Sequence, residues 1–507
     1  MYLDDTKWIQ GYYTFETPIA HGEGFMRLLH DPQVTDEVLS WKIFTFSLTL
    51  SSLKNHPEIA RDLRPIGMEQ HSRATARTWF ETRAEAVEFP NGDPQVVIIG
   101  AGQAGLMTAA RLKRLGVTAL IVEKNARVGD NWRHRYKSLV LHDLIWTCHF
   151  PYLKFPDDWP VFIPKDKMVG WLESYANIME LNVWLESTVE PNSTVYDEAS
   201  GTFTLKVRRG DGSVRELKTH HIVLATGQAG EPYVPSFKGL DDFQGVVMHS
   251  SSYKGDVSWT GKKAVVVGTG SSAHDICEDF HYSGVDVTMV QRRPTLVTNL
   301  EPAASILLKS MYSDVSPPME DSDLAMVSLP IRVMRGIMQM LHGMILEFDK
   351  NTHEGLRKAG FLLEEGNNGG TIMKYLEKGG GFYLNVGCSE LIIDGKVKLK
   401  SGQEISHFEK NGVRMADGTL LEADVVVLAT GYTSMRETAK RIVGPTIADR
   451  TGEVWGLDEG GDPQGIWRRS GHPGFWYMGG NLILSRIFSQ YLALQIKAIE
   501  EGIAQKM

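Results

Sequence analysis

Two glycine-rich segments carry the residue types and spacing that bind the pyrophosphate of a dinucleotide. In the first, a short apolar run precedes the sequence GAGQAG, which begins at Gly100 and ends at Gly105. Gly100 permits a tight turn, Gly102 lets the backbone approach a pyrophosphate, and Gly105 allows a helix to pack closely on a strand. Gln103 and Ala104 begin the helix whose N-terminus would face the phosphate charge. The pattern predicts a strand, a turn and a helix that bind a dinucleotide.

The next predicted strand ends in an acid. The segment TALIVEK, residues 118–124, places Glu123 and Lys124 at the end of that strand. A carboxylate in this position accepts a hydrogen bond from a ribose hydroxyl. Because strand, turn, helix and acid occur together, the segment is far more specific than a glycine-rich turn alone.

A second copy of the turn begins at Gly268. Gly268 and Gly270 repeat the spacing, and an alanine replaces the third glycine, which the fingerprint tolerates. Ser271, Ser272 and Asp275 fall at the start of the helix that comes next. We expect these residues to bind a second dinucleotide.

The strand after the second turn ends in Gln291, Arg292 and Arg293 instead of an acid. An acid there would repel a 2′-phosphate, whereas guanidinium groups bind one through charge-assisted, bidentate contacts. The second nucleotide is therefore predicted to be NADPH. The alternative is a solvated basic turn, because exposed charges are usually no more than exposed.

Composition excludes several classes of protein. The chain has 507 residues, 42% of them hydrophobic and 23% charged, which is typical of a globular protein. A net charge of −9 argues against a general nucleic-acid binder. Cys148, Cys277 and Cys388 lie far apart without metal-ligand spacing, so no metal site is expected. No secretory signal or long apolar run is visible, and we expect a cytoplasmic location and no membrane partner.

Two dinucleotide sites imply two electron carriers, usually FAD and the nicotinamide that reduces it. Six segments occur in the order seen in flavin-containing monooxygenases: GAGQAG, GDNWRHRYKSLVLHD, ATGQAGEPYVP, FQGVVMHSSSY, GTGSSA and VVVLATGY. From about residue 93 to the C-terminus, the chain resembles these class B flavoprotein monooxygenases, and in particular their YUCCA-like branch of microbial type. The resemblance implies FAD and NADPH as cofactors.

The resemblance also assigns the motif F-x-G-x-x-x-H-x-x-x-Y. It is matched by Phe243, Gly245, His249 and Tyr253, at the crossing between the two nucleotide domains. By resemblance, His249 and Tyr253 fix the relative pose of the domains and help to place the nicotinamide over the flavin, as hydride transfer requires. His142 stands where many family members carry an Asn near the flavin, so a flavin contact and a packed loop histidine are both open for it.

Further contacts with the cofactors are expected from the segments that match the family. They are Asp130, Asn131, Trp132, Arg135, Val189, Ala225, Thr226, Gly227, Ala429, Thr430, Gly431, Gly480 and Asn481.

The activity implied by the resemblance is oxygenation. NADPH would reduce FAD, the reduced flavin would capture O2 as a C4a-hydroperoxide, and one oxygen atom would pass to a small nucleophilic substrate such as an amine, a sulfide, indole or an aromatic 2-oxo acid. One alternative is a Baeyer–Villiger monooxygenase acting on ketones, although the related motif of those enzymes ends differently. Another is a non-oxygenating NADPH oxidase or a flavin redox sensor. A disulfide reductase would need two nearby cysteines, which the sequence lacks.

The predicted fold is α/β, with two Rossmann-like dinucleotide-binding domains for FAD and NADPH and a short N-terminal α+β extension. We expect the extension at 1–92, the first part of the FAD domain at 93–242, the NADPH domain with a substrate-side insertion at 243–378, and the second part of the FAD domain at 379–507. The segment 38–50 is predicted as a strand and 72–89 as a charged helix. Whether the extension covers the active site or joins two copies in a homodimer is open.

Overall fold

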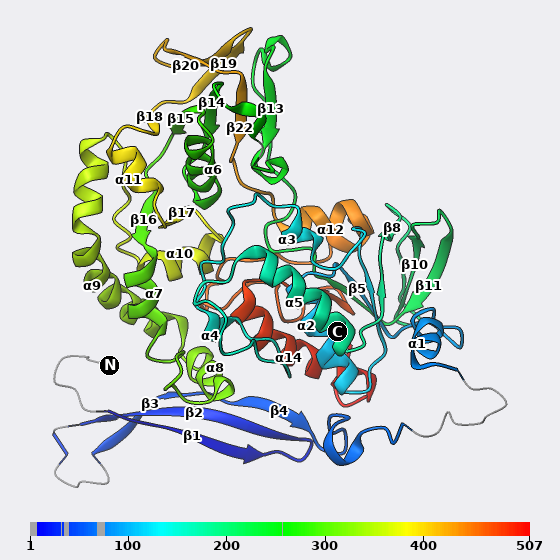
Figure 1. The fold of residues 1–507 in the computed structure, drawn as a ribbon. Coiled ribbons are helices and arrows are strands. Elements are labelled where there is room, and N and C mark those ends of the chain that lie inside the picture. Colours follow the sequence, from blue (N-terminus) through cyan, green and yellow to red (C-terminus); the bar gives the residue numbers. More distant parts are fainter. Residues whose placement is uncertain (1–7, 32, 35–39, 68–76, 256, 507) are drawn as a thin grey trace.

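The structure is a computed structural model that describes residues 8–31, 33–34, 40–67, 77–255 and 257–506. Two parallel sheets form separate bodies, one in the centre and one at the top of Figure 1, with an N-terminal sheet below them. This confirms two Rossmann-like units and an N-terminal α+β extension.

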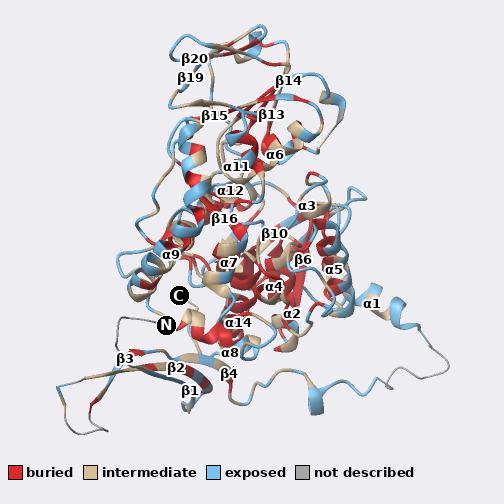
Figure 2. Ribbon diagram, turned by 60° about the vertical axis from the view of Figure 1, so that its left-hand side comes forward, coloured by how far each residue is buried: buried red, intermediate tan, exposed pale blue. Residues whose placement is uncertain are grey.

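The first parallel sheet has five strands in the order β23-β12-β5-β6-β7. Its strands are short apolar runs that are almost wholly buried, as expected for a parallel sheet covered on both faces. Helix α2 packs against α14, and the buried residues of this region gather around β6, α2 and α14 in Figure 2. The bounds are β5 (Val96–Ile99), α2 (Gln103–Arg114), β6 (Ala119–Val122), α5 (Lys165–Ile178), β7 (Val183–Trp184), β12 (His221–Leu224), β23 (Phe475–Tyr477) and α14 (Leu482–Glu500).

The second parallel sheet repeats this plan in the order β13-β22-β14-β15-β18. Helix α6 packs on β14 and β15, and an antiparallel sheet of β19, β20 and β21 extends from this body. The bounds are β13 (Val246–His249), β14 (Lys263–Val267), α6 (Ser271–Tyr282), β15 (Asp286–Gln291), β18 (Lys398–Ser401), β19 (Ile405–Glu409), β20 (Gly412–Met415), β21 (Leu420–Glu422) and β22 (Val425–Leu428).

The sheet topology differs from the expected boundary at residue 378. Strands β18 and β22 lie beyond this boundary, yet β18 pairs with β15 and β22 pairs with both β13 and β14. The second domain therefore continues through Leu428, and the chain rejoins the first sheet at β23. The apolar run of β22, followed by ATG, looks like β12, which is also followed by ATG. Local pattern alone could not tell which sheet each strand joins.

An insertion separates β15 from β18. Helix α9 runs along one side of it, and α10 packs against α9. No single helix among the described residues is long and apolar enough to cross a bilayer; only α8 and α9 together, bent by 104° at their break, meet the length and composition required. The bounds are β16 (Leu296–Asn299), α7 (Leu300–Leu308), α8 (Met319–Val327), α9 (Ile331–Lys358), α10 (Gly370–Lys378), β17 (Phe382–Asn385) and α11 (Cys388–Ile393).

Smaller elements complete the chain. They are α3 (Asp130–Arg133), α4 (Ile145–Cys148), β8 (Thr188–Val189), β9 (Val195–Asp197), β10 (Thr202–Arg208), β11 (Val214–Thr219), α12 (Met435–Val443) and α13 (Pro445–Ala448). Strands β8 to β11 form an antiparallel sheet beside the first domain.

The N-terminal extension is an antiparallel sheet that packs under the insertion and α14. Arg27 carries much of this contact, donating to Ser328 Oγ at 2.9 Å and to the carbonyl of Ala325 at 3.1 Å. Residues 38–39 of the expected strand and 72–76 of the expected helix lie outside the described residues. In the described parts, the single strand expected at 38–50 is two strands, and the helix expected at 72–89 is the shorter α1. The bounds are β1 (Trp8–Glu16), β2 (Ala20–His30), β3 (Trp41–Phe46), β4 (Thr49–Leu53) and α1 (Trp79–Val87).

A buried ion pair ties the insertion to the first domain. Arg486 of α14 donates to both carboxylate oxygens of Asp323 in α8, at 2.8 and 2.6 Å, and its side chain is only 1% exposed. Tyr312 Oη donates to the same carboxylate at 2.8 Å. Removing one partner would leave a buried charge without compensation.

We predict that Arg486→Met lowers the free energy of unfolding by about 3–5 kcal/mol, because it leaves the Asp323 carboxylate without its ion-pair partner. The double variant Arg486→Met/Asp323→Leu should recover a large part of that loss, since it removes both charges. Thermal unfolding at fixed FAD concentration measures both. If the double variant is no more stable than the single one, the cost does not come from the unpaired charge.

Candidate functional site

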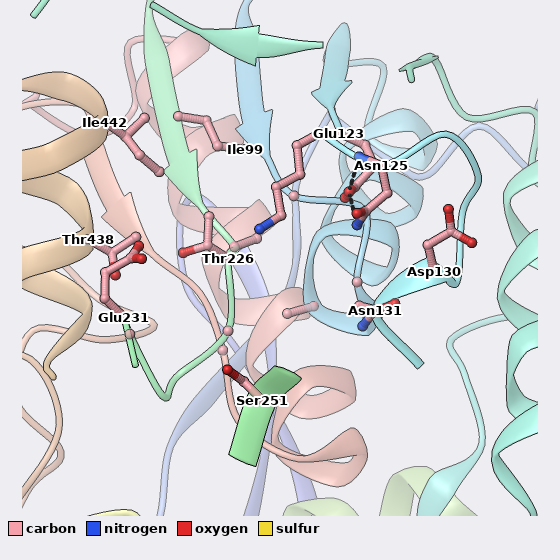
Figure 3. Close-up of a pocket in the computed structure, with 18 of the residues that line it drawn as sticks. Ile99, Glu123, Asn125, Asp130, Asn131, Thr226, Glu231, Ser251, Thr438 and Ile442 are labelled. Atoms are coloured by element: carbon pink, nitrogen blue, oxygen red, sulfur yellow. Dashed lines mark hydrogen bonds between the residues drawn. The ribbon is translucent and has the colours of Figure 1, made fainter. Parts of the chain in front are cut away.

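A cavity of about 640 Å³ opens where β5, β6 and β12 of the first sheet end. Figure 3 shows Glu123, Asn125 and Asp130 on one side of it and Glu231 and Thr438 on the other. Many of the residues predicted to contact a cofactor line it: Gly100, Gly102, Gln103, Ala104, Glu123, Lys124, Asp130, Asn131, Trp132, Arg135, Val189, Ala225, Thr226, Gly227 and Gly480. Sequence reasoning missed several others, among them Asn125, Ser251, Lys254, Tyr432, Thr438 and Arg441.

The three glycines of the first turn have different physical roles. Gly100 has a φ of +109°, and a Cβ on it would lie 2.7 Å from the carbonyl oxygen of Ala225. A Cβ on Gly105 would overlap the carbonyl oxygen of Gly100. A Cβ on Gly102 would have only Asn131 Nδ2 nearby, at 3.5 Å. Gly100 and Gly105 are thus required by the fold itself, whereas Gly102 leaves open the space that a phosphate needs beside the N-terminus of α2.

Glu123 is held at the end of β6 by backbone and side-chain donors. Its Oε2 accepts from the amide of Ala101 at 2.7 Å, and its Oε1 accepts from the amide and the side chain of Asn125 at 2.9 and 2.6 Å. Figure 3 shows the contacts with Asn125 as dashed lines. A carboxylate has further lone pairs, so the fixed oxygens remain able to accept from a ribose hydroxyl.

Two buried donors beside the cavity have no partner among the described residues. They are the indole Nε1 of Trp132 and the hydroxyl of Thr438, and both residues line the cavity. Buried donors in native proteins are nearly always satisfied. Together with the open cradle at Gly102, these unpaired donors fit a bound polar ligand such as FAD.

The second turn has the same backbone geometry as the first. Gly268 has a φ of +123°, and a Cβ on it would overlap the carbonyl oxygen of Ala429. Gly270 precedes α6, and a Cβ on it would meet nothing within 4 Å. Ser271 and Ser272 begin the helix, as predicted. The carbonyl oxygen of Ala429 therefore lies against Gly268 in the same way that the carbonyl oxygen of Ala225 lies against Gly100.

This correspondence corrects the place of the second ATG segment. Ala429, Thr430 and Gly431 were expected in the resumed FAD domain, but they come directly after β22 of the second sheet. Thr430 Oγ1 donates to the carbonyl of Tyr233 at 2.6 Å, and the carbonyl of Gly431 accepts from the amide of Tyr233 at 2.9 Å. The neighbouring Tyr432 lines the cavity of the first domain.

Three residues at the end of β15 are predicted to contact NADPH. One of them is buried inside the domain, and the other two are exposed. Gln291 is fully buried, and its amide donates to the carbonyl of Leu362 at 2.9 Å and accepts from the Leu362 amide at 2.8 Å. This side chain is used inside the domain, so the expected cofactor contact through it is wrong. Arg292 is 61% exposed, 3.7 Å from Glu404, and Arg293 is also exposed. Both remain accessible to a phosphate.

The linker motif makes its contacts with the second domain. The ring of Phe243 packs against Phe408 and beside Gly245, where a Cβ would overlap both this ring and the carbonyl oxygen of Asp424. His249 Nε2 lies 2.9 Å from the carbonyl oxygen of Gly431, so Nε2 carries the proton and donates. Its Nδ1 then accepts from the amide of Ser251 at 3.2 Å.

Tyr253 packs against α6 and does not line the cavity. It is 2% exposed, and its hydroxyl donates to Asp279 of α6 at 2.5 Å. One turn earlier on the same helix, Asp275 accepts from Tyr136, which comes from the first domain. The observed hydrogen bond of Tyr253 fixes it to α6, and its expected role in the relative pose of the domains stays a prediction. Ser251 and Lys254, from the same segment, line the cavity.

His142 and Asn481 lie near the N-terminus of α14. Asn481 Oδ1 accepts from the amide of Leu484 at 3.2 Å and so caps the helix, while its Nδ2 is 3.5 Å from Asp143. Burial raises the pKa of Asp143, and the adjacent His142 acts against this rise. His142 does not line the cavity among the described residues, and its contact with FAD stays a prediction.

Comparisons with known proteins agree with this geometry. Residues 94–314 match a family described as pyridine nucleotide-disulphide oxidoreductase. The probable indole-3-pyruvate monooxygenase YUCCA3 of Arabidopsis thaliana is 34% identical over 67% of this chain and 73% of its own length. The indole-3-pyruvate monooxygenase YUCCA1 of Oryza sativa subsp. japonica is 32% identical over 67% and 77%. The crystal structure of OTEMO with FAD and NADP shares the fold, with a TM-score of 0.53, 17% identity, and coverage of 82% of this chain and 86% of that one.

The chain belongs to the class B flavin-containing monooxygenase family. It is an FAD-dependent monooxygenase that uses NADPH, as the two dinucleotide turns and the linker motif predicted.

The linker histidine generates a pH-dependent prediction. Burial lowers the pKa of His249 below its ordinary value, against the opposing effect of its bond to Gly431. Below about pH 6.5 the unfolded chain would therefore bind a proton at this histidine that the folded protein does not bind as readily. The contribution of neutral His249 to the stability of the fold is thus fully present above this pH and is lost as pH falls.

We expect the unfolding temperature of His249→Gln to depend less on pH than that of the wild type between about pH 7.5 and pH 5.5. The amide of Gln can still donate to Gly431 but does not titrate. His281→Gln, at the half-exposed end of α6, serves as the control. Equal pH dependence in wild type and His249→Gln would contradict the interpretation.

Proposed function

We propose that this enzyme oxygenates a small aromatic 2-oxo acid, for which indole-3-pyruvate is the representative. We further propose that FAD binds in the 640 Å³ cavity and NADPH at the N-terminus of α6. The observation that carries the placement of FAD is the open cradle at Gly102 beside the fixed carboxylate of Glu123. The substrate class rests on the names of the curated relatives, which are indole-3-pyruvate monooxygenases.

The roles of the residues depend on their positions. Glu123 would accept from the adenosine ribose, the first turn of α2 would bind the pyrophosphate, and Trp132 would donate its free indole N–H. Bound FAD would supply the electron transfer and the activation of O2. The linker residues His249 and Tyr253 would act on the pose of the domains through the second domain, where both make their hydrogen bonds, without touching the reacting atoms.

The compartment and partners are proposed with the function. The described cysteines Cys148, Cys277 and Cys388 are free and buried, which suits a reducing, cytoplasm-like compartment. The substrate is a small molecule, with O2 as the second reactant. A homodimer stays a prediction.

NADPH-dependent O2 consumption by the FAD-loaded enzyme tests the function. We expect stimulation by indole-3-pyruvate or phenylpyruvate, with release of CO2 and the acid one carbon shorter, and little stimulation by an amine, a sulfide or cyclohexanone. One 2-oxo acid, O2, NADPH and a proton then balance one shortened acid, CO2, NADP⁺ and water. Turnover of the ketone or the sulfide alone would overturn the substrate class. Formation of H2O2 alone with every compound would favour an oxidase.

The placement of FAD predicts different effects for two glycines. Gly102→Val should abolish FAD retention while the apoprotein keeps its unfolding temperature, because the side chain enters the phosphate space and its Cβ has only Asn131 Nδ2 nearby, at 3.5 Å. Gly105→Val should prevent folding, since its Cβ overlaps the backbone of Gly100. Flavin content and circular dichroism distinguish the two outcomes. Full flavin content in Gly102→Val would place FAD elsewhere.

The preference for NADPH is predicted to depend on Arg292 and Arg293. A charge-assisted bond contributes about 1.5–3 kcal/mol, so Arg292→Ala or Arg293→Ala should weaken NADPH binding by about 10- to 100-fold. NADH lacks the phosphate, so its binding should change little. The ratio of kcat/KM for flavin reduction by the two nucleotides is the measurement, with Lys262→Ala on the same domain as the control. An unchanged ratio in both variants would make the arginines a solvated turn.

A further inference from the structure

One side chain of the insertion reaches the end of the FAD-side cavity. Tyr375 lies on α10, and its hydroxyl donates to Gln228 Oε1 at 2.8 Å and accepts from the backbone amide of Asn481 at 3.1 Å. Both partners are adjacent in sequence to residues that line the cavity, since Gly227 precedes Gln228 and Gly480 precedes Asn481. A single hydroxyl thus joins the two chain segments that form this end of the cavity.

The position of Tyr375 is fixed from its other side. The ring of Trp455 packs edge-on at 5.3 Å, and its Nε1 donates to the Tyr375 carbonyl at 3.0 Å. Trp455 in turn packs against Trp467, whose Nε1 donates to the carbonyl of Gly479 at 2.8 Å. A series of contacts therefore runs from Tyr375 through two tryptophan side chains to Gly479, a residue of the cavity wall.

The hydroxyl remains protonated under physiological conditions. Burial raises the pKa of Tyr375, and the nearby Asp143 acts in the same direction against the bond from Asn481. As a neutral hydroxyl, it donates one hydrogen bond and accepts another, as its two partners require.

The N-terminus of α14 is the group that Tyr375 helps to position. The first amide N–H groups of a helix have no acceptor within the helix and carry a partial positive charge. With the ribose at Glu123 and the pyrophosphate at Gly102, the flavin ring would extend toward this terminus. Reduced FAD carries more negative charge on its ring than oxidised FAD, so donors fixed at the terminus favour the reduced form.

We propose that Tyr375 is a positioning residue that holds Gln228 and the N-terminus of α14 in the arrangement that stabilises reduced FAD. The inference rests on the proposed place of FAD in the cavity. Because Tyr375 belongs to the insertion of the second domain, it makes the flavin environment depend on how this insertion is seated.

The test is Tyr375→Phe, which keeps the ring and removes only the hydroxyl. The variant loses both hydrogen bonds of the hydroxyl, and a difference of about 1 kcal/mol between the two flavin states would lower the affinity for reduced FAD relative to oxidised FAD by about fivefold. The change appears as a more negative midpoint potential of the bound flavin, measured by equilibration with a reference dye. Tyr175→Phe is the matched control, because the Tyr175 hydroxyl also donates to one oxygen, the carbonyl of Pro151 at 3.1 Å, inside the first domain and away from the cavity.

Three results would overturn the proposal. The first is an unchanged potential in Tyr375→Phe, and the second is an equal shift in Tyr175→Phe. If Tyr375→Phe does not hold FAD, Gln228→Leu is measured in its place, and an unchanged potential there is the third. Failure of the FAD placement is seen separately, since Gly102→Val would then keep its flavin.

Discussion

Hydride transfer requires the nicotinamide and flavin rings to be in contact, so the two dinucleotide domains must keep one relative orientation. Hydrogen bonds that cross between the domains include that from Tyr136 of the first domain to Asp275 of α6 and that from the amide of Tyr233 to the carbonyl of Gly431. His249 and Tyr253 fix the linker within the second domain, at Gly431 and at α6. Apolar contacts are non-directional, whereas a buried hydrogen bond fixes the relative position of its two partners, and losing one partner lowers the stability.

The elements added around the two sheets converge on α14. Tyr375 contacts its N-terminus, and Asp323 of the insertion pairs with Arg486 farther along the helix. The N-terminal extension contacts the same insertion through Arg27. Helix α14 also packs against α2, the helix that follows the first glycine-rich turn. The insertion is therefore connected through α14 to the helices whose N-termini border the cavity.

The two nucleotide turns share one backbone conformation and differ at the end of the next strand. Gly100 and Gly268 both adopt positive φ and both approach a carbonyl oxygen at the end of the neighbouring strand. Glu123 then keeps a carboxylate at the cavity, whereas the corresponding Gln291 turns inward to Leu362. Discrimination between the two nucleotides would thus fall to the exposed Arg292 and Arg293 in the second domain rather than to the glutamine.

Local sequence patterns were sufficient to predict the two turns, their buried parallel strands, the final strand and helix, and the family. These features reflect local constraints, such as a positive φ that only glycine readily adopts and short apolar runs that must be buried on both faces. Long-range contacts in the folded chain, in contrast, determine that β22 joins the second sheet and that the side chain of Gln291 bonds Leu362. They also determine that Tyr253 bonds α6 and that Tyr375 reaches the end of the cavity near Gly480. In each of these cases the partner lies far away along the chain, and no local pattern encodes which distant backbone or side chain the fold will bring beside it.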